Sequence, residues 1–78
     1  MGKVRKVKDR LTLHEGLEKS LLDGDIYTHG SKDFYMTSED TYIILDTQGL
    51  HGDVIKESTS LKDVLAEFNA IITKAGGE

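Results

Sequence analysis

Residues 25–57 read DIYTHGSKDFYMTSEDTYIILDTQGLHGDVIKE, and this stretch decides the fold. Short runs of β-branched and aromatic residues alternate in it with small polar residues and glycines, a pattern typical of strands joined by tight turns. Because the connections are short, consecutive strands are expected to run antiparallel as a meander. The predicted strands are Asp25–His29, Lys32–Thr37, Thr41–Asp46 and Asp53–Glu57.

A helix is predicted directly after the last of these strands. Ser60 supplies a hydroxyl cap with Asp63 three residues on, and the apolar residues that follow recur with the helical period. Lys74 suits the negative end of this helix, and the glycines after it end the helix. Its apolar stripe consists of Leu61, Val64, Leu65, Phe68, Ile71 and Ile72.

A second helix is predicted before the meander. Thr12 and Glu15 fit a capping box, and Gly24 supplies the left-handed residue that ends the helix. The apolar stripe of this helix is Leu13, Leu17 and Leu21. We therefore expect one α+β domain in the order α-β-β-β-β-α. Both helices should pack on one face of an antiparallel sheet of four strands, within a range of three to five.

Charge divides the chain after Arg10. Residues 1–10 carry +4 and residues 11–78 carry −8, within a net charge of −4. Because a basic cluster at a terminus is commonly an unstructured interaction tail, residues 1–10 are predicted to be a flexible basic arm. The alternative is an arm that folds back onto the acidic body. The predicted domain then covers residues 11–75, followed by a frayed tail at 76–78. The candidates for nucleic-acid contact are Lys3, Arg5, Lys6, Lys8 and Arg10.

The loop between the second and third predicted strands determines which side chains share a face of the sheet. With a two-residue loop Met36 lies opposite Ile43, and a three-residue loop exchanges the faces of the third strand. In both cases residues 42–45 place apolar side chains on both faces, although two helices can cover only one. We expect the second face to contact another copy or a partner. The interface candidates are Tyr27, Tyr35, Tyr42 and Ile44.

The sequence contains no pattern that indicates catalysis. It has no cysteine, which excludes disulfides and thiolate chemistry. His14 and Glu18 share one helical face, where a weak metal site and a solvated pair are the alternatives. The loop at residues 47–52, which contains His51, is typical of a turn, and a small-ligand or enzymatic site there is the remaining alternative. We expect no metal, no cofactor and no enzymatic activity.

A non-catalytic interaction protein, homodimeric and binding a cellular macromolecule, is therefore the expected function. The longest apolar run is far shorter than a membrane helix requires, so we expect no membrane contact and a cytoplasmic location. The leucines and glycines between Leu11 and Gly24 resemble the start of short phage and bacterial accessory domains. Small, acidic, cysteine-free chains of this kind are frequent among phage and mobile-element proteins that bind a host component, so we expect such a component as the partner.

Two further hypotheses concern charge. In the first, acidic residues near the strand ends compete for a basic partner, with a merely solvated acidic surface as the alternative. Those candidates are Asp23, Asp25, Asp33, Glu39, Asp40, Asp46 and Asp53. In the second, the chain is a nucleic-acid-binding protein that uses its basic arm.

Overall fold

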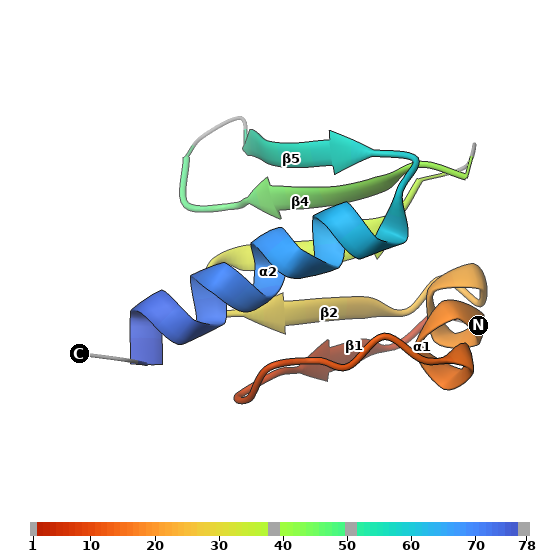
Figure 1. Ribbon diagram of the computed structural model, residues 1–78. Helices are drawn as coiled ribbons and strands as arrows, with labels where there is room; N and C mark the ends of the chain where they lie inside the picture. The colour runs from red at the N-terminus through yellow and green to blue at the C-terminus, as the bar shows by residue number, and fades with distance from the viewer. Residues whose placement is uncertain (1, 38–39, 50–51, 77–78) are drawn as a thin grey trace.

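The computed structural model describes residues 2–37, 40–49 and 52–76. Within these residues the chain forms one sheet and two helices, and α2 crosses the front of the sheet (Figure 1). In chain order the elements are β1 (Val4–Lys6), α1 (Glu15–Leu22), β2 (Ile26–His29), β3 (Lys32–Met36), β4 (Tyr42–Asp46), β5 (Asp53–Ser58) and α2 (Leu61–Gly76).

The five strands lie in the order β1-β2-β3-β4-β5. From β2 to β5 they form the antiparallel meander that the sequence predicts. The five strands fall within the expected range, but the prediction of a purely antiparallel sheet that begins after the first helix is wrong, because β1 precedes α1 and runs parallel to β2. Between these two parallel strands the chain forms α1, which serves as the crossover that a parallel pair requires.

Residues 3–7 are part of the sheet and of the core, so the prediction of a flexible arm at residues 1–10 is wrong for these residues. The Val7 N–H donates to the Thr28 carbonyl at 2.8 Å, and the Ile26 N–H donates to the Lys3 carbonyl at 2.8 Å. Val7 is buried in the hydrophobic core. Charge patterning misses this strand because its hydrogen bonds come from the backbone, which leaves the lysine side chains in solvent.

Helix α1 begins later than the capping box predicts. Its N-cap is His14, whose Nδ1 accepts a hydrogen bond from the Leu17 N–H at 3.3 Å. Residues 10–13 run along α2 instead. There the Asn69 side chain binds both backbone groups of Leu11, at 2.7 Å to the N–H and 2.8 Å to the carbonyl. This tertiary clamp holds the residues that local patterning places at the start of the helix.

Two other predicted helix ends are confirmed. Gly24 follows α1 with a φ of +93°, the left-handed conformation predicted for it. Its N–H donates to the Leu21 carbonyl at 3.0 Å, which satisfies a group at the helix end. At the start of α2 the Asp63 N–H donates to Ser60 Oγ at 3.4 Å. Local capping chemistry therefore sets both of these boundaries.

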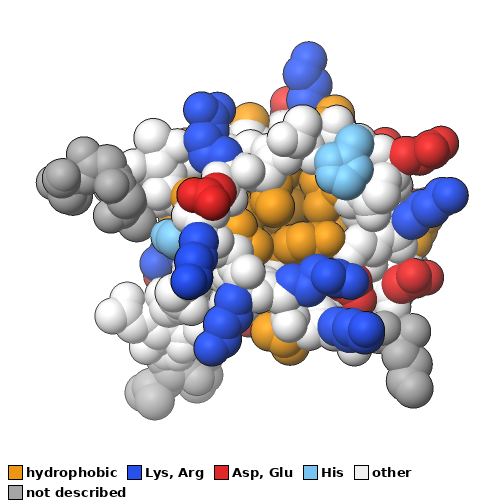
Figure 2. Space-filling model, turned by 90° about the horizontal axis from the view of Figure 1, so that it is seen from below, with side chains coloured by type: hydrophobic (Ala, Val, Ile, Leu, Met, Phe, Trp, Pro, Cys, Tyr) orange, Lys and Arg blue, Asp and Glu red, His pale blue; other side chains and the backbone are white. Residues whose placement is uncertain are grey.

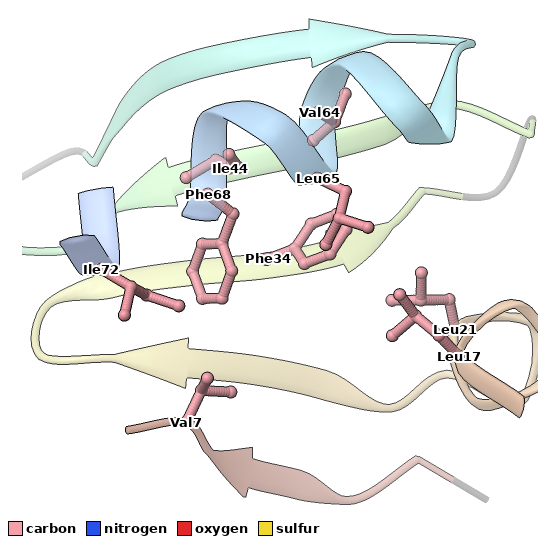
Figure 3. Packing of buried hydrophobic residues seen from close by; sticks show 9 residues of the cluster. All are labelled: Val7, Leu17, Leu21, Phe34, Ile44, Val64, Leu65, Phe68 and Ile72. Carbon is pink, nitrogen blue, oxygen red and sulfur yellow. The ribbon is translucent and has the colours of Figure 1, made fainter. Parts of the chain in front are cut away.

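The core lies between the sheet and the two helices. Phe34 of β3 and Phe68 of α2 are fully buried, with ring centroids 5.2 Å apart. Figure 3 shows side chains of both helices converging on them, so α1 and α2 cover the same face of the sheet. The buried cluster consists of Val7, Leu17, Leu21, Phe34, Ile44, Val64, Leu65, Phe68 and Ile72. From the β1 side, Figure 2 shows hydrophobic side chains at the bottom of a hollow, with a histidine and basic side chains at parts of its rim.

Candidate functional site

The face of the sheet turned away from the helices is the first candidate surface. Phe34 and Ile44 are buried beneath the helices, and successive side chains of a strand alternate between faces. Tyr35 and Ile43, which lie opposite each other in β3 and β4, therefore point to the other side. We call this side the outer face. From the registers it carries Val4, Lys6, Ile26, Thr28, Asp33, Tyr35, Ile43, Leu45, Val54 and Glu57.

An apolar row crosses the outer face from β1 to β4. Val4 lies beside Ile26, and Tyr35 lies beside Ile43. The β2–β3 register, which pairs Tyr27 with Phe34, brings Ile26 opposite Tyr35 and joins the two halves. Val4 remains 68% exposed, and Val54 on β5 is 56% exposed. Neither α1 nor α2 covers this row, although its exposure falls from Val4 through the half-buried Ile26 and Tyr35 to Ile43, which is only 8% exposed.

The structure separates the four interface candidates. Tyr35 lies on the outer face, but Ile44 is fully buried under α2 and cannot contact another molecule. Tyr27 and Tyr42 pack against the buried cluster from the same side as Ile44. The Tyr27 hydroxyl donates to Ser20 Oγ at 2.8 Å, which ties that ring to α1. The prediction that Tyr27, Tyr42 and Ile44 form an interface is therefore wrong, because all three lie on the face that the helices cover.

The physical reason for this exchange is the length of the loop between β3 and β4. The Thr37 N–H donates to the Thr41 carbonyl at 2.7 Å, and Met36 lies opposite Tyr42. Three residues therefore join the strands, which is the alternative that reverses the faces of β4. Asp40 ends this loop with a φ of +59°, the left-handed conformation common in three-residue hairpins. Sequence reasoning missed Ile43 because it used the shorter loop, whereas Ile26 faces outward because the β2–β3 register pairs its neighbour Tyr27 with the buried Phe34.

Charges on the outer face lie mainly at its two edges. Lys6 stands on β1, whereas Glu57 stands on β5 at the opposite edge. Asp33 lies on β3, near the middle. The apolar row thus has a basic side chain at one edge of the sheet and an acidic one at the other.

Asp25 belongs to a structural network and not to an acidic surface. It is 4% exposed, and it accepts hydrogen bonds from Ser20 Oγ, from Arg5 Nε at 2.8 Å and from the Lys3 N–H at 2.9 Å. The Ser20 hydroxyl, followed by the Arg5 side chain and the Lys3 amide, holds the pKa of Asp25 well below its ordinary value. The prediction that Asp25 is part of an acidic surface is therefore wrong, because its buried carboxylate links β1, α1 and the start of β2.

Asp46 has a similar structural role at the other end of the sheet. It accepts a hydrogen bond from the Gln48 N–H at 2.9 Å, and its Oδ2 lies 3.4 Å from Lys32 Nζ. The Gln48 amide, with the nearby Lys32 charge, lowers the pKa of Asp46. The carboxylate therefore stabilises the turn after β4 and pairs β3 with β4.

The remaining acidic candidates do not form one row. Asp23 and Asp40 are exposed at the end of the sheet where β2 and β4 begin, and Asp53 is exposed at the opposite end. Asp33 lies on the outer face, and Glu39 lies outside the described residues. A basic partner would meet these charges on different sides of the molecule, so the fold does not gather them into a single acidic surface.

The basic candidates Lys3, Arg5, Lys6, Lys8 and Arg10 are all exposed but face different ways. Lys6 belongs to the outer face, whereas Arg5 turns toward Asp25. Arg10 lines a groove beside α2 on the helix side. A single phosphate backbone would therefore reach only part of the set.

The histidines have structural partners where they are described. His14 caps α1, and His29 Nδ1 lies 2.8 Å from the Val7 carbonyl. His51 lies outside the described residues. Across residues 2–37, 40–49 and 52–76, no group of three or more metal-ligating side chains is gathered at one point. Nor does this described part of the chain contain a helix with the length and apolarity needed to cross a membrane.

A scan against protein-family models, a search of curated proteins and a search of solved structures found no match to this chain.

Proposed function

We propose that this protein is a non-catalytic interaction module that forms a homodimer, with the outer faces of two copies packed together. The observation that carries the proposal is the uncovered row of Val4, Ile26, Tyr35 and Ile43. Contiguous apolar side chains on a surface commonly mark a binding site, and aromatic residues are enriched in interfaces. We propose a cytoplasmic setting for this dimer, because the chain contains no cysteine.

Charge complementarity favours a second copy as the occupant. A twofold axis that lies between two outer faces and runs along the strands brings β1 of one copy over β5 of the other. By the registers Val4 then lies over Glu57 of the partner, and Lys6 lies two residues farther along β1 on the same face, while the apolar rows meet in the middle. A surface with opposite charges at its two edges is complementary to itself, as a twofold interface requires.

The size of the domain also supports dimer formation. A chain of 78 residues buries only about two thirds of the surface that it exposes when unfolded, so its own core is small. Two sheets packed face to face lie about 10 Å apart and bury the side chains between them. Dimerisation would give the outer face the cover that the helices give the other face.

The experiment is a measurement of solution mass by light scattering at 100 μM protein. The proposal expects the unmodified chain to have about twice its mass of 8.7 kDa. Asp33 of each copy already lies on β3 near the axis, and the Tyr35→Glu variant would add a carboxylate inside the apolar row, between Ile26 and Ile43. Burial of that unpaired charge in the interface is costly, so we expect a monomer. Leu22→Glu is the matched control, since Leu22 is 66% exposed on α1 and lies away from the outer face.

Either of two results would overturn the proposal. One is a mass near 8.7 kDa for the unmodified chain. The other is a Tyr35→Glu variant that is folded by circular dichroism and still dimeric. Point variants are preferable to deletion of residues 1–10, because that deletion would remove β1 and the buried Val7.

A further inference from the structure

A groove on the helix side of the molecule is separate from the proposed dimer interface. It runs between residues 10–13 and α2, with a volume of about 800 Å³, and it opens to solvent. Leu13, which is 44% exposed, lines it from one side. Ala66 and Ala70 line it from α2, beside the buried Leu65. We call this the α2 groove.

The wall opposite α2 is held in place by Asn69. The Asn69 side chain accepts a hydrogen bond from the Leu11 N–H at 2.7 Å and donates one to the Leu11 carbonyl at 2.8 Å. Both backbone groups of Leu11 are therefore satisfied, and the extended segment is fixed along the helix. A groove that exists before binding avoids part of the cost of ordering a loop on association.

Positive charge borders the α2 groove. Arg10 lies on the extended segment, and Lys62 and Lys74 lie toward the two ends of α2. No acidic side chain is among the described residues that line it. This is a departure from the rest of the chain, since residues 11–78 carry a net charge of −8. An apolar floor with a cationic border is complementary to an apolar ligand that carries negative charge on its flanks.

From this geometry we propose that the α2 groove binds an acidic amphipathic helix of a partner protein. Ala66 and Ala70 are four residues apart on α2, so they present a low surface against which a second helix can approach closely. The apolar stripe of the partner would lie on these alanines and on Leu13, and its acidic flanks would face Arg10, Lys62 and Lys74. Docking of an amphipathic helix into a groove uses anchors spaced by three and four residues.

This proposal does not depend on dimer formation. The groove lies on the side of the sheet that the helices cover, and the proposed dimer interface lies on the other. If the chain is a dimer and the groove binds a helix, each dimer has two grooves. A partner with two acidic helices would then bind more tightly, because binding of its first helix raises the effective concentration of the second. A monomer would present one groove and bind a single helix in the same way.

The test is a selection from a displayed library of random 18-residue peptides, with the full-length chain as the target. We expect enriched peptides to carry leucine, isoleucine or phenylalanine at positions i, i+3, i+4 and i+7, with aspartate and glutamate on the flanks. Their affinity should fall at least tenfold for Ala70→Glu, which fills the floor of the groove and adds a negative charge. Gln48→Glu is the matched control, because it adds the same charge at an exposed turn residue outside the groove.

Charge is tested separately with the selected peptides. Lys62→Glu with Lys74→Glu should weaken their binding at least tenfold, and the affinity for the unmodified chain should fall as salt is raised. Lys19→Glu on α1 is the control for a lost surface lysine and should leave the affinity unchanged. The proposal is overturned if the selection enriches no peptide, if the enriched peptides are not acidic, or if Ala70→Glu binds them as well as Gln48→Glu does.

Discussion

Arg5 of β1 donates a hydrogen bond from Nε to Oδ2 of Asp25 at 2.8 Å, across twenty residues of sequence. The same carboxylate accepts from the Lys3 N–H and from Ser20 Oγ. Three segments therefore meet at one buried acid: the first strand, helix α1 and the start of β2. The basic charge of the first ten residues is thus used in part to hold β1 in the sheet.

Replacement of Asp25 by asparagine is expected to destabilise the fold in a pH-dependent manner. The folded-state pKa of Asp25 lies below its ordinary value of about 3.8. The stability that the ionised group contributes is therefore present above about pH 4 and is lost as the pH falls toward the folded-state pKa. The difference in unfolding free energy between the unmodified chain and Asp25→Asn should be largest near pH 7 and shrink toward pH 2. Urea unfolding at pH 7, 4 and 2 measures it.

Asp53→Asn is the matched control for this experiment, because Asp53 is exposed and lies outside the network. A difference between the unmodified chain and Asp25→Asn that stays constant from pH 7 to pH 2 would contradict the role assigned to the Asp25 carboxylate.

Replacement of Asn69 by alanine is expected to release the segment that walls the α2 groove. The change removes both hydrogen bonds to Leu11, at a cost of about 1–3 kcal/mol for the pair. Hydrogen exchange should show faster exchange at the Leu11 amide, with little change at amides of β3 and β4. Thr73→Ala, at an exposed residue that also lines the groove, should leave the Leu11 amide protected. Equal protection in Asn69→Ala and in the unmodified chain would show that the clamp does not hold this segment.

Gly24→Ala is expected to destabilise the protein by about 1–2 kcal/mol, since a side chain in the left-handed region meets the carbonyl that follows it. Gly24 has a φ of +93° at the end of α1. Thermal or urea unfolding at one fixed protein concentration measures the change. Gly49→Ala is the control, because among the described residues an added Cβ there would approach no atom closer than 3.6 Å, and we expect a change within about 0.5 kcal/mol. Equal effects of the two substitutions would contradict the assigned role of Gly24.

The basic residues near the start of the chain are not expected to act together on nucleic acid. Arg5 is paired with Asp25, and Lys6 and Arg10 lie on opposite sides of the sheet. A duplex DNA titrated by fluorescence anisotropy should therefore show weak binding with a shallow dependence on salt. Five phosphate contacts would instead give a slope of log affinity against log salt of about −4.5. A slope that steep would support the nucleic-acid hypothesis against the proposed interaction module.

Much of the secondary structure could be predicted because its causes are local. The strands between residues 25 and 57 follow from β-branched and aromatic runs bounded by turn residues, and each differs from its predicted bounds by one residue at most. The helical spacing of the apolar residues along α2 and the left-handed conformation of Gly24 also follow from local patterns. These elements depend mainly on residues within a few positions of one another, which the sequence shows directly.

The candidate site was predicted less well, because the length of one loop decides which side chains share a face. The helices leave one face of the sheet uncovered, but Tyr42 and Ile44 of β4 lie on the other side, and so does Tyr27, whose facing is set by its pairing with Phe34. One extra loop residue moves every side chain of β4 to the opposite face. Asp40, at the end of that loop, has the positive φ that accompanies the longer turn, and aspartate is compatible with both turn lengths.

The sequence by itself determined the meander, the two helices, their caps at Ser60 and Gly24, and the presence of more apolar side chains than two helices can cover. Tertiary structure alone decided that Val4–Lys6 joins the sheet beside Ile26 and that Asn69 holds Leu11. It also decided that Ile43, not Ile44, faces outward. The physical reason is that the first group follows from hydrogen bonds and periodicity within a few residues. The second depends on pairings between residues distant in sequence, which form only when the whole core is assembled.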